Sequence, residues 1–305
     1  MKKEKFSKPF STYNEQLAIL QTRGLTVSDR EAAEAFLSFC NYYRFSGYLL
    51  AFEDERHVLF PNTSFENARR LYEFDRNLRC LVAEAIAEIE ISVRTRIAHE
   101  LKIFNDPFFH RNKRIFQPQR HIDWDGWHAK VIEETRRSQE LFVRHYEKKY
   151  VEFPELPIWV LTELMSFGSL SKLYACLQPK YQKTASKFFG VPHVVLVSWL
   201  HSLTNIRNLC AHHSRLWDRS LSVPPKVPHN LVEFQYFQQD GSTWRLFFVL
   251  SIIKFLLDRI KERTNVDIEW RQRIVALINN RPPVPNFERF LGLPNDWQQM
   301  ILWQQ

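Results

Sequence analysis

Residues 64–104 read SFENARRLYEFDRNLRCLVAEAIAEIEISVRTRIAHELKIF and hold the strongest structural signal in the chain. Apolar residues recur along this segment at intervals of three and four, the spacing that places side chains on one face of an α-helix. They are Leu71, Phe74, Leu78, Leu81, Ala85, Ile89, Val93, Ile97 and Leu101. The spacing predicts a long amphipathic helix. We expect a break near Asp75, because a single helix of about forty residues exceeds the usual length.

Helical spacing continues on both sides of this segment, and strand-like alternation is nearly absent. The expected helices are two short ones between Asn14 and Phe52, a charged one from Trp127 to about Tyr150, and others at Ile158–Leu164, Leu170–Leu177, from His193 onward, Thr243–Glu262 and Asp267–Asn279. Phe167, Gly168 and Ser169 are expected to form a turn. The pattern predicts an all-α bundle with no linker between separate halves.

The composition is that of an ordinary globular protein. Of the 305 residues, 45% are apolar and 25% are charged, so the chain can bury a core. Only 7 residues are glycine, which leaves little material for a Gly-rich nucleotide-binding loop. The net charge of +8 suits a polyanionic partner, although a charge of this size is also common for solubility alone.

The cysteines and the apolar segments indicate where the protein resides. Cys40, Cys80, Cys176 and Cys210 are far apart and form no Cys-x-x-Cys pair, so we expect buried thiols in a reducing compartment. The basic start of the chain precedes no apolar segment typical of an export signal. The longest apolar stretch, Leu246–Leu257, is too short to span a membrane. We therefore expect a cytoplasmic protein with no membrane partner.

The segment Val197–Arg219 carries the polar residues of greatest interest, and its spacing predicts a single helix. The expected core-facing seam consists of Trp199, Leu203, Ile206, Cys210, His213 and Trp217. The opposite stripe holds no Glu or Lys and consists of His201, Asn205, Asn208, His212, Arg215 and Arg219. Asn and His are weaker helix formers than the Glu, Lys and Gln usual on a solvated face. The stripe therefore predicts a site or an interface, with an ordinary exposed face as the alternative.

Arg207 and His212 in this segment suit the cleavage of RNA. A histidine, whose ordinary pKa is about 6.5, can take a proton from a ribose 2′-hydroxyl or give one to the leaving 5′-oxygen. The planar guanidinium of an arginine can bind the phosphate and stabilise the charge that grows in the transition state. Asn208 lies four residues before His212 and can orient its imidazole. DNA lacks the 2′-hydroxyl, so we expect it to be spared.

The spacing of Arg207 and His212 also predicts a homodimer. Five residues separate them by roughly 140° around a regular helix and about 7.5 Å along its axis. One helix cannot easily direct both side chains to the same atom. We therefore expect the Val197–Arg219 helices of two chains to pair, so that both copies of Arg207 and His212 converge on one phosphodiester.

A second pair, Arg94 and His99, has the same spacing on the long helix. Glu90 and Glu100 lie nearby as ion-pair partners, and no Asn follows the arginine. These differences favour a structural role for Arg94 and His99.

Other polar residues are candidates with clear structural alternatives. Tyr43 and Arg44 can stack on or clamp RNA, although aromatic residues at helical spacing more often belong to the core. Glu163 and Ser166 can line a pocket beside the expected Val197–Arg219 helix or form a helix-end hydrogen bond. The histidines show no spacing typical of metal ligands, so we expect no metal site.

Several blocks of sequence, taken together, resemble one known family. They are Lys8-Pro9-Phe10 with Gln16, Gly24-Leu25, Asn41–Tyr48, Leu71–Arg76, Glu88-Ile89-Glu90 with Arg94, Glu163–Gly168, Arg207–Trp217, and Gly292-Leu293-Pro294 with Trp297. In this order they resemble the Abi-like family of bacterial abortive-infection proteins, of the AbiD/AbiF type. That family is similar to HEPN-domain ribonucleases, whose signature is an Arg, a polar residue that is often Asn, three further residues and a His. Arg207, Asn208 and His212 match this signature.

The resemblance implies an all-α, HEPN-like helical bundle with additional N- and C-terminal helices. The whole chain, residues 1–305, would form one Abi-like module. Its HEPN-like core would span about residues 64–262, with the N-terminal helices in residues 10–60 and a C-terminal helix and tail in residues 263–305.

The resemblance also implies a metal-independent endoribonuclease without a cofactor, a dimer across the signature helix and a toxin-like role in antiphage defence. RNA is the expected substrate, and a small regulatory RNA or an antitoxin is a further expected partner. The expected catalytic residues are Arg207, Asn208 and His212, and the expected RNA contacts are His201, Asn205, Arg215, Arg219, Tyr43 and Arg44. The alternative is a non-catalytic RNA-binding or scaffold protein built on the same bundle.

Overall fold

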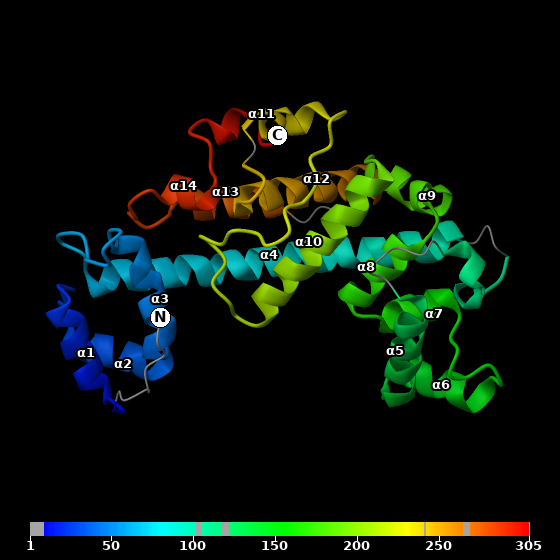
Figure 1. Ribbon diagram of the computed structural model, residues 1–305, viewed down its shortest axis with the longest axis horizontal. Coiled ribbons are helices and arrows are strands. Elements are labelled where there is room, and N and C mark those ends of the chain that lie inside the picture. The colour runs from blue at the N-terminus through cyan, green and yellow to red at the C-terminus, as the bar shows by residue number, and fades with distance from the viewer. Residues whose placement is uncertain (1–8, 102–104, 117–122, 241, 265–268, 305) are drawn as a thin grey trace, which may run out of the picture. The chain divides into compact units, whose positions relative to one another are not determined.

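The computed structural model describes residues 9–101, 105–116, 123–240, 242–264 and 269–304. Regular structure in these residues is helical, with fourteen α-helices, α1 to α14, several short 3-10 helices and no β-strand (Figure 1). The all-α bundle expected from the apolar spacing is therefore confirmed. No helix in this part of the chain combines the length and the hydropathy that a membrane span requires.

The chain divides into two compact units. The first contains residues 1–78 and 274–289, and the second contains residues 79–273 and 290–305. Helix α4 (Phe65–Glu100) supplies residues to both units. That residues 1–305 form one module, with a core at about residues 64–262, stays a prediction.

The first unit has an aromatic core. Its further helices are α1 (Tyr13–Thr22), α2 (Arg30–Phe39), α3 (Tyr42–Leu49), the end of α13 (Trp270–Asn279) and the start of α14 (Phe287–Leu291). Helix α1 packs against α2, and Phe36 contacts the rings of Phe45 and Tyr72 edge to face. Three helices occupy the segment in which two are expected. Asn41 separates α2 from α3 because its Oδ1 accepts the Tyr43 N–H at 2.8 Å and caps α3.

The second unit holds the helices that form the candidate site. They are the rest of α4 and α13 together with α5 (Trp124–Arg137), α6 (Leu141–Lys149), α7 (Ile158–Leu164), α8 (Phe167–Cys176), α9 (Pro179–Phe189), α10 (His193–Ala211), α11 (Gln235–Asp240) and α12 (Leu246–Thr264). Helix α10 packs against α8 and α9, α8 packs against α5, and α9 packs against α12 (Figure 1). Most residues of α12 are buried, so this helix forms much of the core of the second unit.

Helix α4 is continuous, so the expected break near Asp75 is wrong. The Asp75 side chain is fully buried, and its Oδ2 accepts a hydrogen bond from the Tyr48 hydroxyl at 2.7 Å. A carboxylate that bonds to a tertiary partner does not compete for its own backbone. The interior of α4 also contains neither Gly nor Pro, so nothing local interrupts it.

Several other helix boundaries differ from the expected ones. The helix expected from Trp127 to Tyr150 is divided into α5 and α6, because Ser138 is extended and its Oγ accepts the Glu140 N–H at 3.2 Å. The turn expected at Phe167–Ser169 is instead the first turn of α8. The expected starts of α7 and α10 and the end of α7 are confirmed, whereas α9, α11 and α14 were not expected.

The cysteines are mostly buried. Cys40, Cys176 and Cys210 are buried as expected, but Cys80 is exposed, so the expectation is wrong for that thiol. Burial raises the pKa of the Cys176 thiol to about 11.

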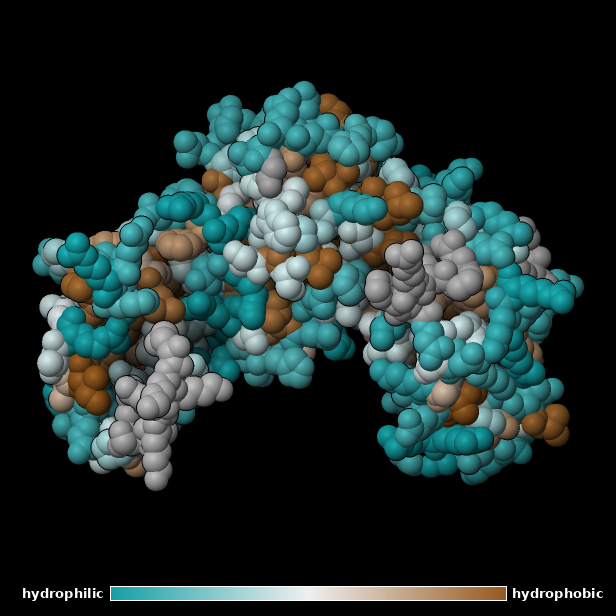
Figure 2. Space-filling model, in the orientation of Figure 1, coloured by the Kyte–Doolittle hydropathy of each residue, from teal (hydrophilic) through white to brown (hydrophobic). Residues whose placement is uncertain are grey.

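On the face shown in Figure 2, hydrophilic residues predominate and hydrophobic residues form separate patches.

Candidate functional site

Helix α10 has one buried face that holds it in place. Trp199 is fully buried, and its Nε1 donates a hydrogen bond to the Lys226 carbonyl at 2.8 Å. Leu203, Ile206 and Cys210 continue the same face and are buried. The expected core-facing seam is confirmed for these positions, which leaves the opposite face of α10 for polar residues.

Helix α10 ends earlier than its spacing predicts. It stops at Ala211, so the expected single helix over Val197–Arg219 is wrong. His213 adopts a φ of 54°, and the N–H groups of His213 and Ser214 donate to carbonyls of the last helical turn at 3.0 and 2.9 Å. This is a Schellman end, which usually has Gly in the left-handed position. His tolerates that conformation better than most residues, so the helix ends here without a glycine to mark the end in the sequence.

The early end of α10 changes two positions of the expected seam. His213 is exposed, so its expected place in the core is wrong. Trp217 is buried as expected, but it belongs to the segment that follows the helix. Its ring packs edge to face against Phe290, within the same unit.

The polar face of α10 contains the expected catalytic residues. His201, Arg207 and Asn208 are exposed, and Asn205 is half-buried. His212 is the C-cap residue and is exposed, and its N–H donates to the Asn208 carbonyl at 2.9 Å. Because of this hydrogen bond, His212 keeps its place one turn beyond Asn208 although it lies outside the helix.

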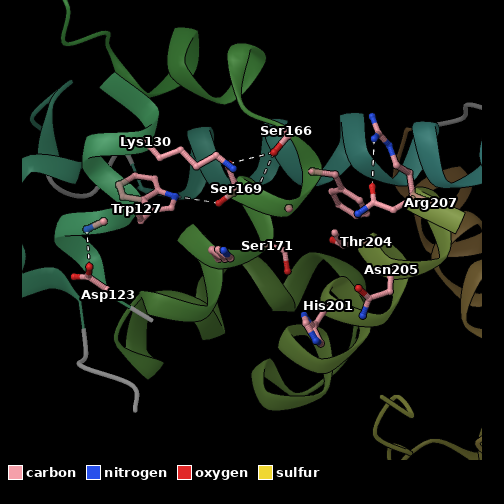
Figure 3. Close-up of a pocket in the computed structure, with 15 residues that line it drawn as sticks. Asp123, Trp127, Lys130, Ser166, Ser169, Ser171, His201, Thr204, Asn205 and Arg207 are labelled. Atoms are coloured by element: carbon pink, nitrogen blue, oxygen red, sulfur yellow. Dashed lines mark hydrogen bonds between the residues drawn. The ribbon is translucent and has the colours of Figure 1, made fainter. Parts of the chain in front are cut away.

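Two hollows border this polar face. The first hollow has a volume of about 530 Å³, lies between α5, α8 and α10, and is lined by Arg207 among other residues (Figure 3). The second hollow has a volume of about 340 Å³ and lies between α10 and residues 219–223, with His212 in its lining. Asn205 and Asn208 line both hollows. Within one chain, the Arg207 guanidinium and the His212 imidazole therefore line different hollows.

The three expected arginines of the site have different surroundings. Among the described residues, the Arg207 guanidinium donates one hydrogen bond, from Nη1 to the Asn208 Oδ1 at 3.4 Å. No carboxylate of these residues forms an ion pair with Arg207. Arg215 lies beyond the helix and forms an ion pair with Asp218 in which Nε and Oδ1 are 3.0 Å apart. Arg219 also lies beyond the helix and lines the second hollow. The expected stripe therefore continues past α10, but as a loop rather than as a helical face.

The second Arg–His pair has the structural surroundings that its neighbours predict. The Arg94 guanidinium is largely buried, pairs with Glu90 and donates to the Thr162 carbonyl. His99 Nδ1 lies 3.7 Å from Glu100 Oε1. These contacts engage Arg94 inside the second unit, so Arg207 and not Arg94 presents an accessible guanidinium.

The N-terminal candidates lie on α3 of the first unit. Tyr43 is 87% exposed and Arg44 is also exposed, so both side chains are accessible to a ligand. Tyr48 on the same helix is buried against Asp75. The expected RNA contacts at Tyr43, Arg44, His201, Asn205, Arg215 and Arg219 stay predictions.

A charged cluster of the second unit has Glu155 at its centre. Its Oε2 lies 3.2 Å from His110 Nε2, and its Oε1 lies 2.9 Å from His128 Nε2. Burial alone raises the pKa of the Glu155 carboxyl, but the hydrogen bond from His110 and the charges of His128, His110 and Arg111 together hold it below its ordinary value. Among the described residues, no group of three or more His, Cys, Asp or Glu side chains has an arrangement that could hold a metal ion.

Sequence reasoning missed the residues that form the far wall of the first hollow. Lys130 on α5 and Lys172 on α8 line it, although neither stands out by spacing or by a motif. Ser166 has both of the roles considered for it, because it lines the hollow and its Oγ accepts the Ser169 N–H at 3.2 Å as the N-cap of α8. The Ser-x-x-Ser spacing before an apolar run was the available signal for this cap.

Comparison with known proteins gives one match. A family model described as an Abi-like protein matches residues 35–218, which is more than half of the chain and includes α10 with Arg207, Asn208 and His212. Neither the curated proteins nor the solved structures gave a significant match.

Proposed function

Because this chain belongs to the Abi-like protein family, we propose that it is a metal-independent endoribonuclease that acts as a toxin-like effector in abortive infection. We place it in the AbiD/AbiF type, with a HEPN-like bundle and RNA as substrate. The observation that carries the proposal is the end of α10, where Arg207, Asn208 and His212 are all exposed. Arg207 has no carboxylate partner among the described residues, so its charge is available to a phosphate.

The proposed reaction requires only groups of this chain. The imidazole of one His212 removes the proton of the ribose 2′-hydroxyl, and the 2′-oxygen forms a bond to phosphorus. The bond between phosphorus and the 5′-oxygen then breaks, and this oxygen takes a proton from the second chain's His212. The products are a 2′,3′-cyclic phosphate and a 5′-hydroxyl.

Arg207 and Asn208 support this transfer in different ways. The Arg207 guanidinium binds the non-bridging phosphate oxygens and stabilises the negative charge that increases in the transition state. Asn208 lies one turn before His212 and positions the imidazole or the same phosphate. Both residues act without a proton transfer of their own.

The separation of the two hollows supports a site shared between two chains. Arg207 lines the first hollow and His212 lines the second, although Asn205 and Asn208 border both. Two copies of α10 that pair at a two-fold axis bring both kinds of group to one phosphodiester. Within the proposal, a small regulatory RNA or an antitoxin restrains this dimer until infection.

Variants of the two signature residues test the proposal. Arg207→Ala and His212→Ala should each lower the cleavage rate by about 10²- to 10⁴-fold, the usual effect of removing a general acid–base or a charge-stabilising group. The measurement is growth after expression in bacteria, together with sequencing of cellular RNA ends. Wild type should arrest growth and produce new ends with cyclic phosphate or its hydrolysis product.

Two matched controls sharpen this test. Arg207→Lys keeps the charge but loses the planar fork, so it should retain only part of the activity. His145→Ala removes an exposed imidazole of α6, outside both hollows, and should behave as wild type. Equal activity in wild type, Arg207→Ala and His212→Ala would contradict the proposed chemistry. RNA binding without new ends would favour the scaffold alternative.

A further inference from the structure

The first hollow has the size and the walls of a ligand site. Its volume of about 530 Å³ lies within the range of about 300–1,000 Å³ that is usual for such sites. Its walls come from α5, α8 and α10, which are far apart in the sequence (Figure 3). Through Arg207, Asn205 and Asn208, this hollow is continuous with the polar face of α10.

Positive charge exceeds negative charge in this hollow. Lys130, Lys172 and Arg207 line it, whereas Asp123 is the one carboxylate among the described residues of its lining. Asp123 is the N-cap of α5, and its two oxygens accept the N–H groups of Asp125 and Gly126 at 3.0 Å each. The Asp123 carboxylate is therefore already engaged by its own helix and competes little for the three cations.

The cations of the hollow are available to an anion. Lys172 has no carboxylate partner among the residues that the structure describes, and the same holds for Arg207. Lys130 Nζ lies 3.7 Å from Glu134 Oε1, and the Lys130 side chain is exposed whereas that of Glu134 is half-buried. A surface pair of this kind has little net energy, so a phosphate can replace Glu134 as the partner of Lys130.

The start of α8 adds to this positive field. Ser166, Phe167, Gly168 and Ser169 line the hollow, so the N-terminal turn of a ten-residue helix opens onto it. The N-terminus of a helix carries a partial positive charge and favours an anion within its first turn. The Trp127 and Phe167 rings in the lining offer little stacking surface, because Trp127 is 6% exposed and Phe167 is 1% exposed, which leaves the imidazole of His201 as the exposed ring among the described lining residues.

We propose that the first hollow binds a backbone phosphate of single-stranded RNA next to the linkage that is cut, through Lys130, Lys172 and the first turn of α8. The proposal rests on the proposed function, since it extends the RNA path from Arg207 toward α5. Because charge and not stacking dominates the lining, this contact positions the strand without selecting its bases. A duplex presents its phosphates over a broad surface and does not fit a hollow of this volume.

A binding assay with uncleavable RNA tests this site separately from catalysis. The probe is a short fluorescent 2′-O-methyl oligouridylate, which has no free 2′-hydroxyl to attack the phosphate. Lys130→Gln and Lys172→Gln should each weaken binding by about 3- to 10-fold and lower the slope of log K against log salt by about 0.7. Lys172→Arg keeps the positive charge, so its RNA affinity and its salt slope should equal those of wild type.

The matched control is Lys187→Gln, which removes the same charge from an exposed position on α9 outside the hollow. It should bind as wild type, and all variants should keep the thermal unfolding midpoint of wild type. The proposal is overturned if the hollow variants bind like Lys187→Gln, or if affinity falls with no change in salt slope. Equal competition by duplex RNA overturns the assigned substrate class.

A parallel cleavage assay with an all-ribose strand distinguishes the two proposals. If wild type cleaves RNA but the lysine variants bind RNA as wild type does, only the role of the first hollow is contradicted. Wild type that does not cleave contradicts the proposed function, and the binding comparison still decides whether the hollow holds the strand.

Discussion

The residues around Glu155 lower the pKa of its carboxyl. Its carboxylate lies between the imidazoles of His110 and His128, and Arg111 Nε lies 3.8 Å from Oε2. The His110 side chain is fully buried, and this carboxylate is its hydrogen-bond partner. A lowered pKa in the folded state means that ionised Glu155 stabilises the fold.

Glu155→Gln should lower the free energy of unfolding by about 1.5–3 kcal/mol near pH 6, the usual range for a hydrogen bond to a charged group. The difference should be fully present above the ordinary carboxyl pKa of 4.5 and should disappear as the pH falls through the lower folded value. Thermal unfolding between pH 3 and pH 6 measures it. Glu152→Gln is the control, since Glu152 is exposed three residues earlier. A difference that grows toward low pH would contradict this account.

At the scale of the element, the end of α10 sets the position of the candidate catalytic imidazole. His213 has a left-handed backbone conformation, and His212 precedes it as the C-cap. If the helix continued to Arg219, the polar stripe would be longer and His213 would lie in the core. The Schellman end instead leaves both histidines exposed and directs the chain toward the loop that lines the second hollow.

Substitutions at His213 should show how strongly this conformation is required. His213→Gly should be neutral or slightly stabilising, because Gly adopts a positive φ without steric cost. His213→Val should cost about 1–2 kcal/mol, since a β-branched residue is a clear outlier there. Thermal unfolding of the two variants measures the difference. Equal stability of the Gly and Val variants would show that the helix end does not require the left-handed conformation.

These variants also separate His213 from its neighbour His212 in function. His213→Gly should keep the growth arrest and the new RNA ends of wild type, because His213 lines neither hollow. Loss of activity in this well-folded variant would move the proposed acid–base role away from His212.

At the scale of the whole molecule, the proposed reaction uses groups from two chains. Arg207 lines the first hollow and His212 lines the second, and the proposed dimer brings both kinds of group to one phosphodiester. Sedimentation equilibrium should give twice the mass of one chain at concentrations that support cleavage. Specific activity should fall on dilution as the dimer dissociates.

His212→Ala is the control for this prediction, because an exposed side chain can be removed without unfolding the chain. It should dimerise as wild type while losing cleavage. A protein that is monomeric throughout, with activity proportional to concentration, would contradict the shared site.

Much of the second unit follows from local pattern. The apolar spacing of residues 64–104 predicts α4, Pro157 and Pro192 mark the starts of α7 and α10, and Trp199, Leu203, Ile206 and Cys210 mark the buried face of α10. These features can be predicted from the sequence because a helix repeats every 3.6 residues and buries one face. The spacing of apolar residues that are close in the chain therefore indicates the helix and its buried face. The same pattern identifies Arg207, Asn208 and His212 as polar residues that do not fit an ordinary solvated face.

Packing alone sets the remaining features. Asp75 does not interrupt α4 because Tyr48, a residue of another helix, bonds to it. α10 ends at a histidine in a left-handed conformation, with no glycine or proline to mark the end. Lys130 and Lys172 join Arg207 in one hollow because α5, α8 and α10 pack together. No periodicity within a single helix records which other helices will lie beside it, so these features depend on contacts between residues far apart in the chain.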